Sequence, residues 1–270
     1  QLLRRTEPGH PGKLPAFRTL INGRNFSVLL DQYADHIAAA ITAIRETQRE
    51  KIIQAAQMVK AVLVRDGLIY VFGCGHSHIL AEETFYRAGG LANVAPVFYE
   101  PLMLHQGAAE SSRLEKQPGL AREVLKNCPA TKNDIFFCLS TSGVNAVPVE
   151  AAEIIRSRGI PTVAICSSAY FDQNARSASG KHLYEVSDLW IDNKAPHGDA
   201  CLLPQGAAIK TTPLSTITGA FILNSILAEA TQLALAEGVG VPIYLSGNIP
   251  GGAERNKALI DRFSPRIQSL

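Results

Sequence analysis

The chain has 270 residues, of which 46% are hydrophobic and 19% are charged, so it can bury a sizeable core in one large domain or two small ones. A formal net charge of +2 gives no support for binding to nucleic acid or to a membrane surface. No unbroken apolar run approaches the roughly 20 residues that span a bilayer, and the five cysteines form no CxxC pair. We therefore expect a cytoplasmic protein without a disulfide framework.

Three regions can be distinguished along the chain. Residues 1–28 include three prolines and lack an apolar core, and we expect them to be a poorly ordered N-terminal extension, either native or added to the chain. Their arginines could instead form a partner-binding arm. Residues 29–245 are expected to form one domain, and residues 246–270 a tail with a short helix. The alternative for this tail is that it reaches over a site, in the same or a partner subunit.

The first element of the domain is a long helix. Apolar residues recur at spacings of three and four, or their multiples, from Tyr33 to Leu63, and Asp66-Gly67 ends the pattern. Buried parallel strands read as continuous apolar runs. The runs that fit are LIYVF at 68–72, ANVAPVF at 92–98, DIFFCLS at 134–140, IPTVAICSS at 160–168 and LWID at 189–192.

Helical patterns alternate with these strands. One follows LIYVF, one lies near 120–126 and one covers 145–158, whereas residues 99–117 have no clear period. Pro213 is expected to open a last long helix, with Thr212 as its cap. Strands alternating with helices predict an open parallel sheet covered on both faces, that is, an α/β fold.

Two polar loops follow buried strands in this pattern. The first, GCGHSH at residues 73–78, lies between a strand and a helix, where a glycine turn usually cradles a phosphate. A dinucleotide fingerprint needs a third glycine where this chain has His78, and the Gly-Lys-Ser/Thr of a P-loop is absent from the sequence. We therefore expect neither NAD nor any other cofactor.

The second loop, STSGVN at residues 140–145, also follows a strand and opens a helix. Hydroxyls and backbone N–H groups at a helix N-terminus can hold an anion without lysine or arginine. Loops after parallel strands gather at one edge of the sheet, so we expect both loops to face one crevice. The expected ligand-binding residues are Gly73, Gly75, His76, Ser77, Ser140, Thr141, Ser142, Gly143 and Asn145.

The Gly-x-Gly-x-Ser turn and the Ser-x-Ser-Gly-x-Asn loop together resemble the sugar isomerase (SIS) domain, over roughly residues 30–237. The segments AEETFYRAGG, PHGDA, PLSTITGAFILN and SGNIPGGAERNK are similar to an uncharacterised bacterial group of stand-alone SIS proteins. The resemblance implies a three-layer αβα sandwich with a five-stranded parallel sheet, flavodoxin-like or Rossmann-like. It also implies a homodimer with sites near the subunit interface. The implied ligand is a phosphorylated sugar or amino sugar, because SIS domains bind phosphosugars.

An aldose–ketose isomerase needs a base that moves a proton between neighbouring carbons. In phosphoheptose isomerases a similar AEE motif supplies the catalytic glutamate, and the resemblance carries this role to Glu83. The motif there lies about one helical turn further from the serine, and the histidine on the last helix of that family has no equivalent here. His105 and His197 are the substitute candidates. Each could instead only hydrogen-bond within its loop, and Glu82 and Glu83 could be a solvated pair.

The two histidines of the first loop raise the question of a metal. Residues two apart at a helix start point in different directions, unlike the i, i+4 pairs of zinc sites. His78 and Glu82 have that spacing and could furnish two ligands. We nevertheless expect no metal, with His76 in contact with the sugar or phosphate and His78 packed against or hydrogen-bonded to a neighbour.

Two functions from different classes fit these residues. The first is a sugar-phosphate isomerase or lyase that uses a glutamate for proton transfer. The second is a non-catalytic phosphosugar sensor, although the sequence contains no recognisable DNA-binding module. Neither nucleic acid nor membrane is an expected partner.

Overall fold

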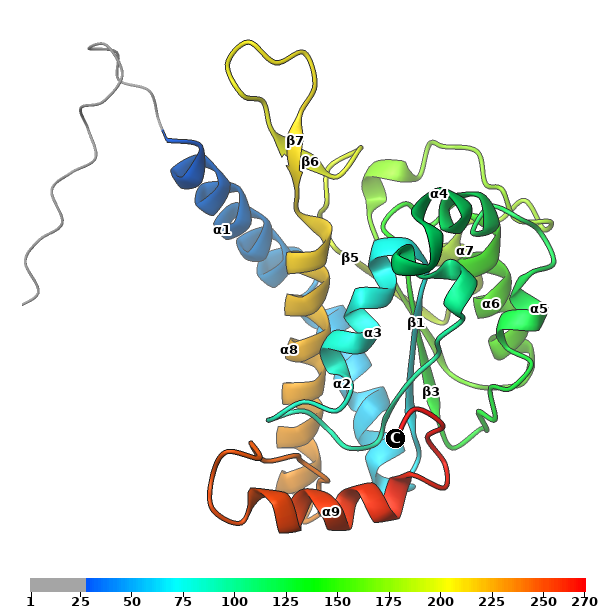
Figure 1. The fold of residues 1–270 in the computed structure, drawn as a ribbon, viewed down its shortest axis with the longest axis vertical. Coiled ribbons are helices and arrows are strands. Elements are labelled where there is room, and N and C mark those ends of the chain that lie inside the picture. Colours follow the sequence, from blue (N-terminus) through cyan, green and yellow to red (C-terminus); the bar gives the residue numbers. More distant parts are fainter. Residues whose placement is uncertain (1–27) are drawn as a thin grey trace, which may run out of the picture.

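The computed structural model describes residues 28–270 (Figure 1). Its centre is a five-stranded parallel sheet in the order β2-β1-β3-β4-β5. The strands are β1 (Ile69–Gly73), β2 (Val94–Pro96), β3 (Ile135–Leu139), β4 (Thr162–Cys166) and β5 (Leu189–Asp192). Every residue of β1, β3 and β4 is buried. All five predicted strands are confirmed, because burial on both faces leaves the continuous apolar run that was used to find them.

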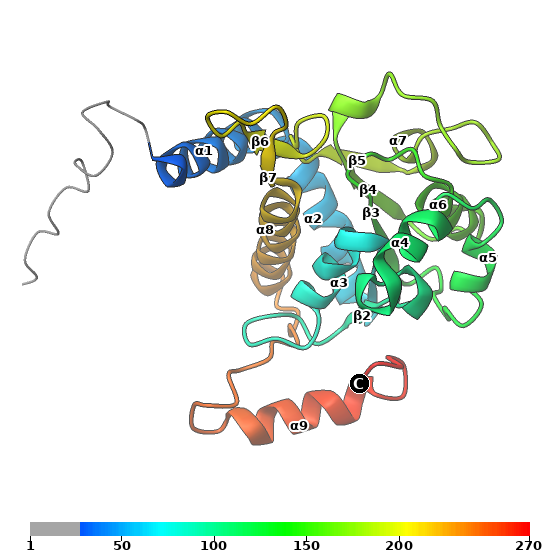
Figure 2. The ribbon, with the colours of Figure 1, turned by 45° about the horizontal axis from the view of Figure 1, so that its top comes forward.

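Helices cover both faces of the sheet, so the predicted three-layer αβα sandwich is confirmed (Figures 1 and 2). One face packs against α2 (Arg49–Val64), α3 (Ile79–Thr84) and α8 (Ser215–Ala236). The other packs against α5 (Ala121–Val124), α6 (Ala146–Ser157), α7 (Leu183–Val186) and α9 (Gly252–Phe263). The remaining elements are α1 (Leu29–Thr47), α4 (Leu104–Leu114), and the 3-10 turns η1 (Gly75–His78), η2 (Glu100–Leu102) and η3 (Ser168–Tyr170). The expected N-terminal extension lies outside the described residues except for Val28.

The predicted first helix is two helices, α1 and α2, which meet at Gln48. This side chain is buried; its Oε1 accepts the N–H of Asp192 at 3.1 Å and its Nε2 donates to the carbonyl of Thr47 at 2.9 Å. The break therefore ties the helix pair to the end of β5. The apolar spacing continues across it, which is why the sequence pattern predicted a single helix. From the break, α1 projects away from the sheet (Figures 1 and 2).

The start of the last long helix also differs from the prediction. Pro213 does not open it; Thr211–Pro213 form β7, which pairs antiparallel with β6 (Ala200–Leu202). Helix α8 begins two residues later, at Ser215. The hairpin was missed because its two strands have only three residues each.

Among the described residues, α8 is the one helix long and apolar enough to cross a membrane by length and composition. It contains no unbroken apolar run of that length, because polar residues such as Ser225, Glu229 and Thr231 interrupt it. The helix packs along α2 and α3, and 39% of its most apolar window is buried in the fold. A core helix of this kind meets the same length and composition test.

The C-terminal segment packs at the amino edge of the sheet. Phe263 and Ile267 are buried in the core, and Arg262 Nη2 lies 2.7 Å from Oδ1 of Asp66, just before β1. Arg266 Nη2 donates to the carbonyl of Asp66 at 2.7 Å. Within one chain, α9 thus lies at the opposite edge from the loops that follow the strands (Figure 1).

The two outer strands of the sheet are short and partly covered. The ammonium of Lys51 lies 3.5 Å from the ring centre of Trp190 in β5. Burial lowers the pKa of Lys51, although the nearby Asp192 opposes the shift. At the other side, β2 contains Pro96, and the chain just before it is hydrogen-bonded to the segment around Tyr244.

Candidate functional site

The strand order creates a switch point at the carboxyl edge of the sheet. β1 and β3 lie side by side, and the chain continues from β1 to β2 on one side and from β3 to β4 on the other. In doubly wound sheets, ligands bind in the crevice outside the carboxyl ends of the strands at such a point. The loops at residues 73–78 and 140–145 leave the sheet here, on either side of one crevice.

A half-open pocket lies in this crevice, and both predicted loops line it. The expected ligand-binding residues that contribute are His76, Ser77, Ser140 and Thr141. Three polar residues that the sequence did not suggest complete the lining: Asn193, Ser215 and Thr216. The apolar part consists of Leu80, Leu139 and Ile165. The pocket is half-open, so a ligand as large as a sugar phosphate would place one end here and extend outward.

Several polar groups of this pocket have unused hydrogen-bonding capacity. Within residues 28–270, no hydrogen bond occupies the hydroxyls of Ser77, Thr141 or Thr216. The hydroxyl oxygen of Ser140 accepts the N–H of Gly143 at 3.2 Å, which leaves its O–H free to donate. Asn193 Oδ1 accepts the N–H of Ala195 at 3.1 Å, which leaves the amide nitrogen free. The pocket therefore offers at least five neutral donors.

Close approach and backbone conformation account for two of the predicted glycines. A Cβ at Gly73 would lie 2.6 Å from the backbone carbonyl carbon and oxygen of Ser77, so a side chain here would displace the first loop. Gly143 has a φ of +64°, and a Cβ there would lie 3.3 Å from the Cβ of Cys166. Glycine at these positions lets the two loops fold tightly over the ends of their strands.

The remaining part of the first loop is held internally. The Nδ1 of His78 is hydrogen-bonded to the carbonyl of Gly75, and its Nε2 lies 3.3 Å from Oε1 of Glu82. His78 is buried, as expected for a packed residue, whereas His76 is exposed at the pocket. Across residues 28–270, no three His, Cys, Asp or Glu side chains gather into a group that could hold a metal.

Two polar side chains of the second loop do not line the pocket in this chain. Asn145 donates through Nδ2 to Oε1 of Glu115 at 2.7 Å and accepts a hydrogen bond from Arg176 at Oδ1. Its side chain thus joins the start of α6 to the end of α4. Burial raises the pKa of Glu115, although Lys116 and Arg176 oppose the shift. Ser142 is half-buried between Thr141 and Gly143, outside the pocket lining.

Glu83, the expected catalytic base, is not at the pocket of its own chain. It pairs with Arg87 one turn along the chain, and its Oε1 lies 3.5 Å from Nδ2 of Asn224 in α8. Asn224 is eight residues beyond the pocket residue Thr216, which corresponds to about 12 Å along the helix axis. Glu83 is therefore separated from the pocket by about two turns of α8.

The two histidine candidates also lie outside the lining. His105, in the first turn of α4, is exposed, and its ring centre lies 6.5 Å from that of His78. His197 stacks on Tyr170 with ring centres 4.9 Å apart, and its Nε2 lies 2.7 Å from Nε2 of Gln173. His197 thus connects the loops that follow β4 and β5.

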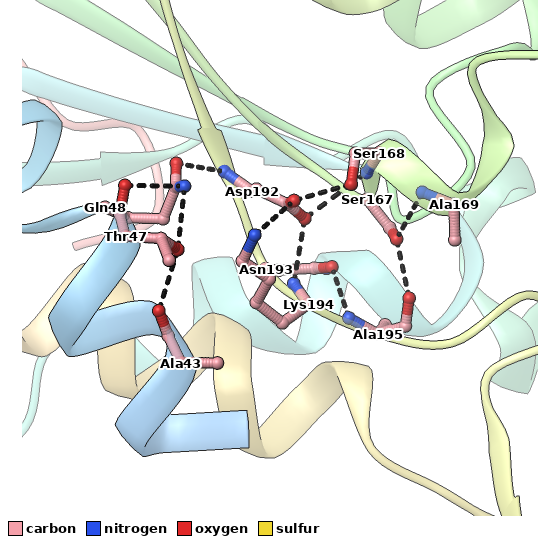
Figure 3. A network of polar contacts seen from close by, with 10 residues as sticks. All are labelled: Ala43, Thr47, Gln48, Ser167, Ser168, Ala169, Asp192, Asn193, Lys194 and Ala195. Carbon is pink, nitrogen blue, oxygen red and sulfur yellow. Dashed lines mark hydrogen bonds and ion pairs between the residues drawn. The ribbon is translucent and has the colours of Figure 1, made fainter. Parts of the chain in front are cut away.

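A network of hydrogen bonds fixes the end of β5 next to the pocket (Figure 3). Oδ2 of Asp192 accepts the hydroxyl of Ser168 at 2.6 Å and lies 3.0 Å from Nζ of Lys194, while Oδ1 accepts the N–H of Lys194 at 2.9 Å. Burial alone would raise the pKa of Asp192, but these hydrogen bonds outweigh it and hold the pKa below its ordinary value. The neighbouring Asn193 is thereby held in place in the pocket wall.

A second carboxylate organises the start of α8. Oδ1 of Asp199 accepts the N–H groups of Leu214 and Ser215 at 3.1 and 2.8 Å, and its Oδ2 accepts the hydroxyl of Ser215 at 2.6 Å. Asp199 therefore caps the helix from fifteen residues upstream. It places Ser215 and Thr216 at the pocket.

The fold and this pocket define the class of protein: a doubly wound α/β domain with a ligand pocket at its switch point. Within that class, a profile of the SIS domain matches residues 32–167. The chain belongs to the SIS domain family.

Curated relatives cover nearly the same length. The chain is 44% identical over 243 residues to a UPF0309 protein of Geobacillus thermodenitrificans, which covers 90% of this chain and 98% of that protein. It is 39% identical over 242 residues to a UPF0309 protein of Brucella anthropi, with 90% and 99% covered. Among solved structures, the chain resembles a phosphoheptose isomerase from Francisella tularensis. The TM-score is 0.48 at 16% identity, covering 76% of this chain and 100% of that one.

Proposed function

We propose that the protein binds a phosphosugar, with the phosphate group of the ligand in the pocket at the switch point. The observation that carries this proposal is the set of neutral donors that have no partner there. Donors without a protein partner in a half-open pocket are available to a ligand, and an excess of donors is matched by a ligand group that only accepts. A phosphate monoester presents three such oxygens, and a helix N-terminus favours its charge.

The family and the shape of the pocket support the same ligand. SIS domains, which the two loops resemble, bind phosphosugars, and the matched region contains both loops. The half-open pocket suits one end of a ligand, and the rest of the ligand would extend outward. Recognition of phosphate by hydroxyls and N–H groups requires no lysine or arginine in the lining.

A sugar-phosphate isomerase or lyase is the finer form of this proposal. Such an enzyme needs a group at the substrate that can take up a proton. Among the described residues that line the pocket, His76 is the one titratable side chain, so it is better placed than Glu83, His105 or His197 within one chain. The alternative is a non-catalytic sensor, which is favoured by the lack of a carboxylate among the lining residues.

A panel of hexose, hexosamine and N-acetylhexosamine phosphates tests the proposal. Binding is followed by calorimetry and conversion by NMR, for the wild type and for Ser140→Ala, His76→Gln and Glu83→Gln. We expect one class of sugar phosphate to bind and Ser140→Ala to weaken it. Turnover that is lost in His76→Gln but kept in Glu83→Gln would support an enzyme with His76 as its base. Tight binding without turnover would support the sensor, and no binding by the wild type would refute the phosphosugar proposal.

We also propose a homodimer that forms through the projecting surface made by α1 and the β6–β7 hairpin. These elements lie side by side, and Tyr33 Oη donates to the carbonyl of Pro213 at 2.8 Å (Figures 1 and 2). Leu30 is 73% exposed and Ile209 is 81% exposed on this surface. Clustered exposed apolar side chains of this kind mark interaction sites.

Light scattering coupled to gel filtration tests the dimer. Ile209→Asp and Leu30→Asp should shift the protein toward the monomer mass, because each would bury a charge in the interface. Val64→Asp is the matched control, since Val64 is also exposed but lies at the far end of α2. A monomeric wild type would refute the proposal.

A cytoplasmic location stays a prediction. All five cysteines are free in the structure.

A further inference from the structure

The pocket has a second polar wall that the SIS motifs do not include. This wall consists of Asn193 at the end of β5 and of Ser215 and Thr216 at the start of α8, opposite the two loops. Its residues come from segments more than 45 positions after the second loop. Their use of hydrogen bonds shows which of them are available to a ligand.

Helix α8 has unpaired N–H groups at the pocket. The first N–H groups of any helix have no partner inside the helix. Asp199 accepts those of Leu214 and Ser215, whereas the N–H groups of Thr216 and Ile217 have no partner in the described part of the chain. The 22-residue helix also directs the positive end of its dipole toward this point.

The hydroxyl groups of Ser215 and Thr216 also differ in whether they are already hydrogen-bonded within the protein. The hydroxyl of Ser215 is donated to Asp199, so toward a ligand Ser215 can only accept. The hydroxyl of Thr216 has no partner in the part of the chain that the structure describes. Thr216 is thus a free donor, and its neighbour Ser215 is not.

Asn193 provides an independent observation that points to a ligand. It is 3% exposed and lines the pocket. Because Oδ1 accepts the N–H of Ala195, the amide orientation is determined, and the amino group is left without a partner among residues 28–270. Since Asn193 lines the half-open pocket, this amino group can donate to an acceptor oxygen of a ligand there.

We propose that Thr216 and Asn193 bind the phosphate of the ligand from the side opposite Ser140, so that it is held between the two loops and the N-terminus of α8. This rests on the proposed function. Asp199 acts as a positioning residue: it occupies the first two N–H groups and Ser215, and thereby presents Thr216 and Ile217 to the phosphate. The ligand class is a phosphate monoester, bound entirely by neutral donors and helix termini.

Titration with inorganic phosphate and with hexose 6-phosphates tests the proposal in the full-length protein. Affinity is measured by calorimetry, and the amide resonances of Thr216 and Ile217 are followed by NMR. We expect both resonances to shift on addition of phosphate. Thr216→Val should weaken binding roughly tenfold, as for loss of a hydrogen bond to a charged group. Asn193→Asp should weaken it further, because it replaces a donor by an anion.

Matched variants separate this proposal from the proposed function. Thr231→Val, four turns along the same helix, should leave the affinity unchanged. Asp199→Asn should reduce both the affinity and the shift of the Thr216 resonance while the circular dichroism spectrum is kept. If Ser140→Ala weakens binding but Thr216→Val and Asn193→Asp do not, the second wall is refuted and phosphosugar binding stands. If the wild type binds neither phosphate nor any hexose phosphate, both proposals fall.

Discussion

Replacement of Asp192 by asparagine should destabilise the protein, and by an amount that depends on pH. In Asp192→Asn, one oxygen remains to accept the N–H groups of Ser168 and Lys194. The amino group takes the place of the oxygen that accepts the Ser168 hydroxyl at 2.6 Å and pairs with Lys194 at 3.0 Å. The substitution thus makes all three hydrogen bonds to the carboxylate neutral and removes one ion pair, while the cost of burying the charge is also removed and offsets part of the loss.

The expected loss in the free energy of unfolding is about 1–2 kcal/mol at neutral pH. A hydrogen bond to a charged group contributes about 1.5–3 kcal/mol and a neutral one about 1 kcal/mol. The ion pair adds little, because Lys194 is 27% exposed and can turn to water. Asp261→Asn is the matched control: Asp261 pairs with Lys257 at the surface, and its replacement should have no measurable effect.

The pH dependence follows from the lowered pKa of Asp192. The contribution of the carboxylate is complete above the pKa of the unfolded chain, about 3.9, and is lost as the pH falls through the lower pKa of the folded state. Urea denaturation followed by circular dichroism should therefore give a constant gap between wild type and Asp192→Asn from about pH 8 to about pH 5, and a narrowing gap below about pH 4. A gap of zero at neutral pH, or one that widens in acid, would refute this account of the network.

Three further changes test other parts of the structure. Gly73→Ala should lower the free energy of unfolding by about 1–3 kcal/mol and abolish phosphate binding, because the added Cβ would lie 2.6 Å from the Ser77 carbonyl. Thermal unfolding measures the stability and calorimetry the phosphate affinity, and an unchanged affinity would contradict the prediction. Burial raises the pKa of Cys166 to about 12, so this thiol should resist a thiol reagent until urea is added, and rapid labelling of the native protein would be inconsistent with the core. Phe263→Ala should lower the free energy of unfolding by about 3–5 kcal/mol. It should not change the phosphate affinity, since α9 packs at the amino edge of the sheet and the pocket lies at the carboxyl edge. A loss of affinity with the fold intact would contradict this prediction.

The sequence was informative wherever burial alone determines the pattern. All five strands were found because they are buried on both faces, and the alternation with helices then predicted the layers and the edge at which loops gather. The same rule could have identified Asn193, which directly follows the LWID strand. Only the two motif-bearing loops were followed to the carboxyl edge, so the third was overlooked.

The features that were missed depend on contacts between distant segments. The break at Gln48 is determined by its hydrogen bond to Asp192, 144 residues away, while the apolar spacing runs through it without interruption. The start of α8 is determined by Asp199, which lies across a hairpin of very short strands. No local pattern distinguishes such a cap from an ordinary surface aspartate.

The position of Glu83 could not be predicted from its motif, because it depends on how α3 packs against α8. Only the three-dimensional structure shows its contacts with Arg87 and Asn224.

The short, covered outer strands restrict how this protein can associate. An exposed strand edge is a template on which another chain can add a strand, and proteins avoid such growth with short edge strands, proline and lysine. Here β2 has three residues and contains Pro96, while the Lys51 ammonium over Trp190 places a charge beside β5. These features disfavour edge-to-edge pairing of the sheets of two copies of this chain. They thereby protect against fibrous aggregation and leave helix and hairpin surfaces for specific contacts.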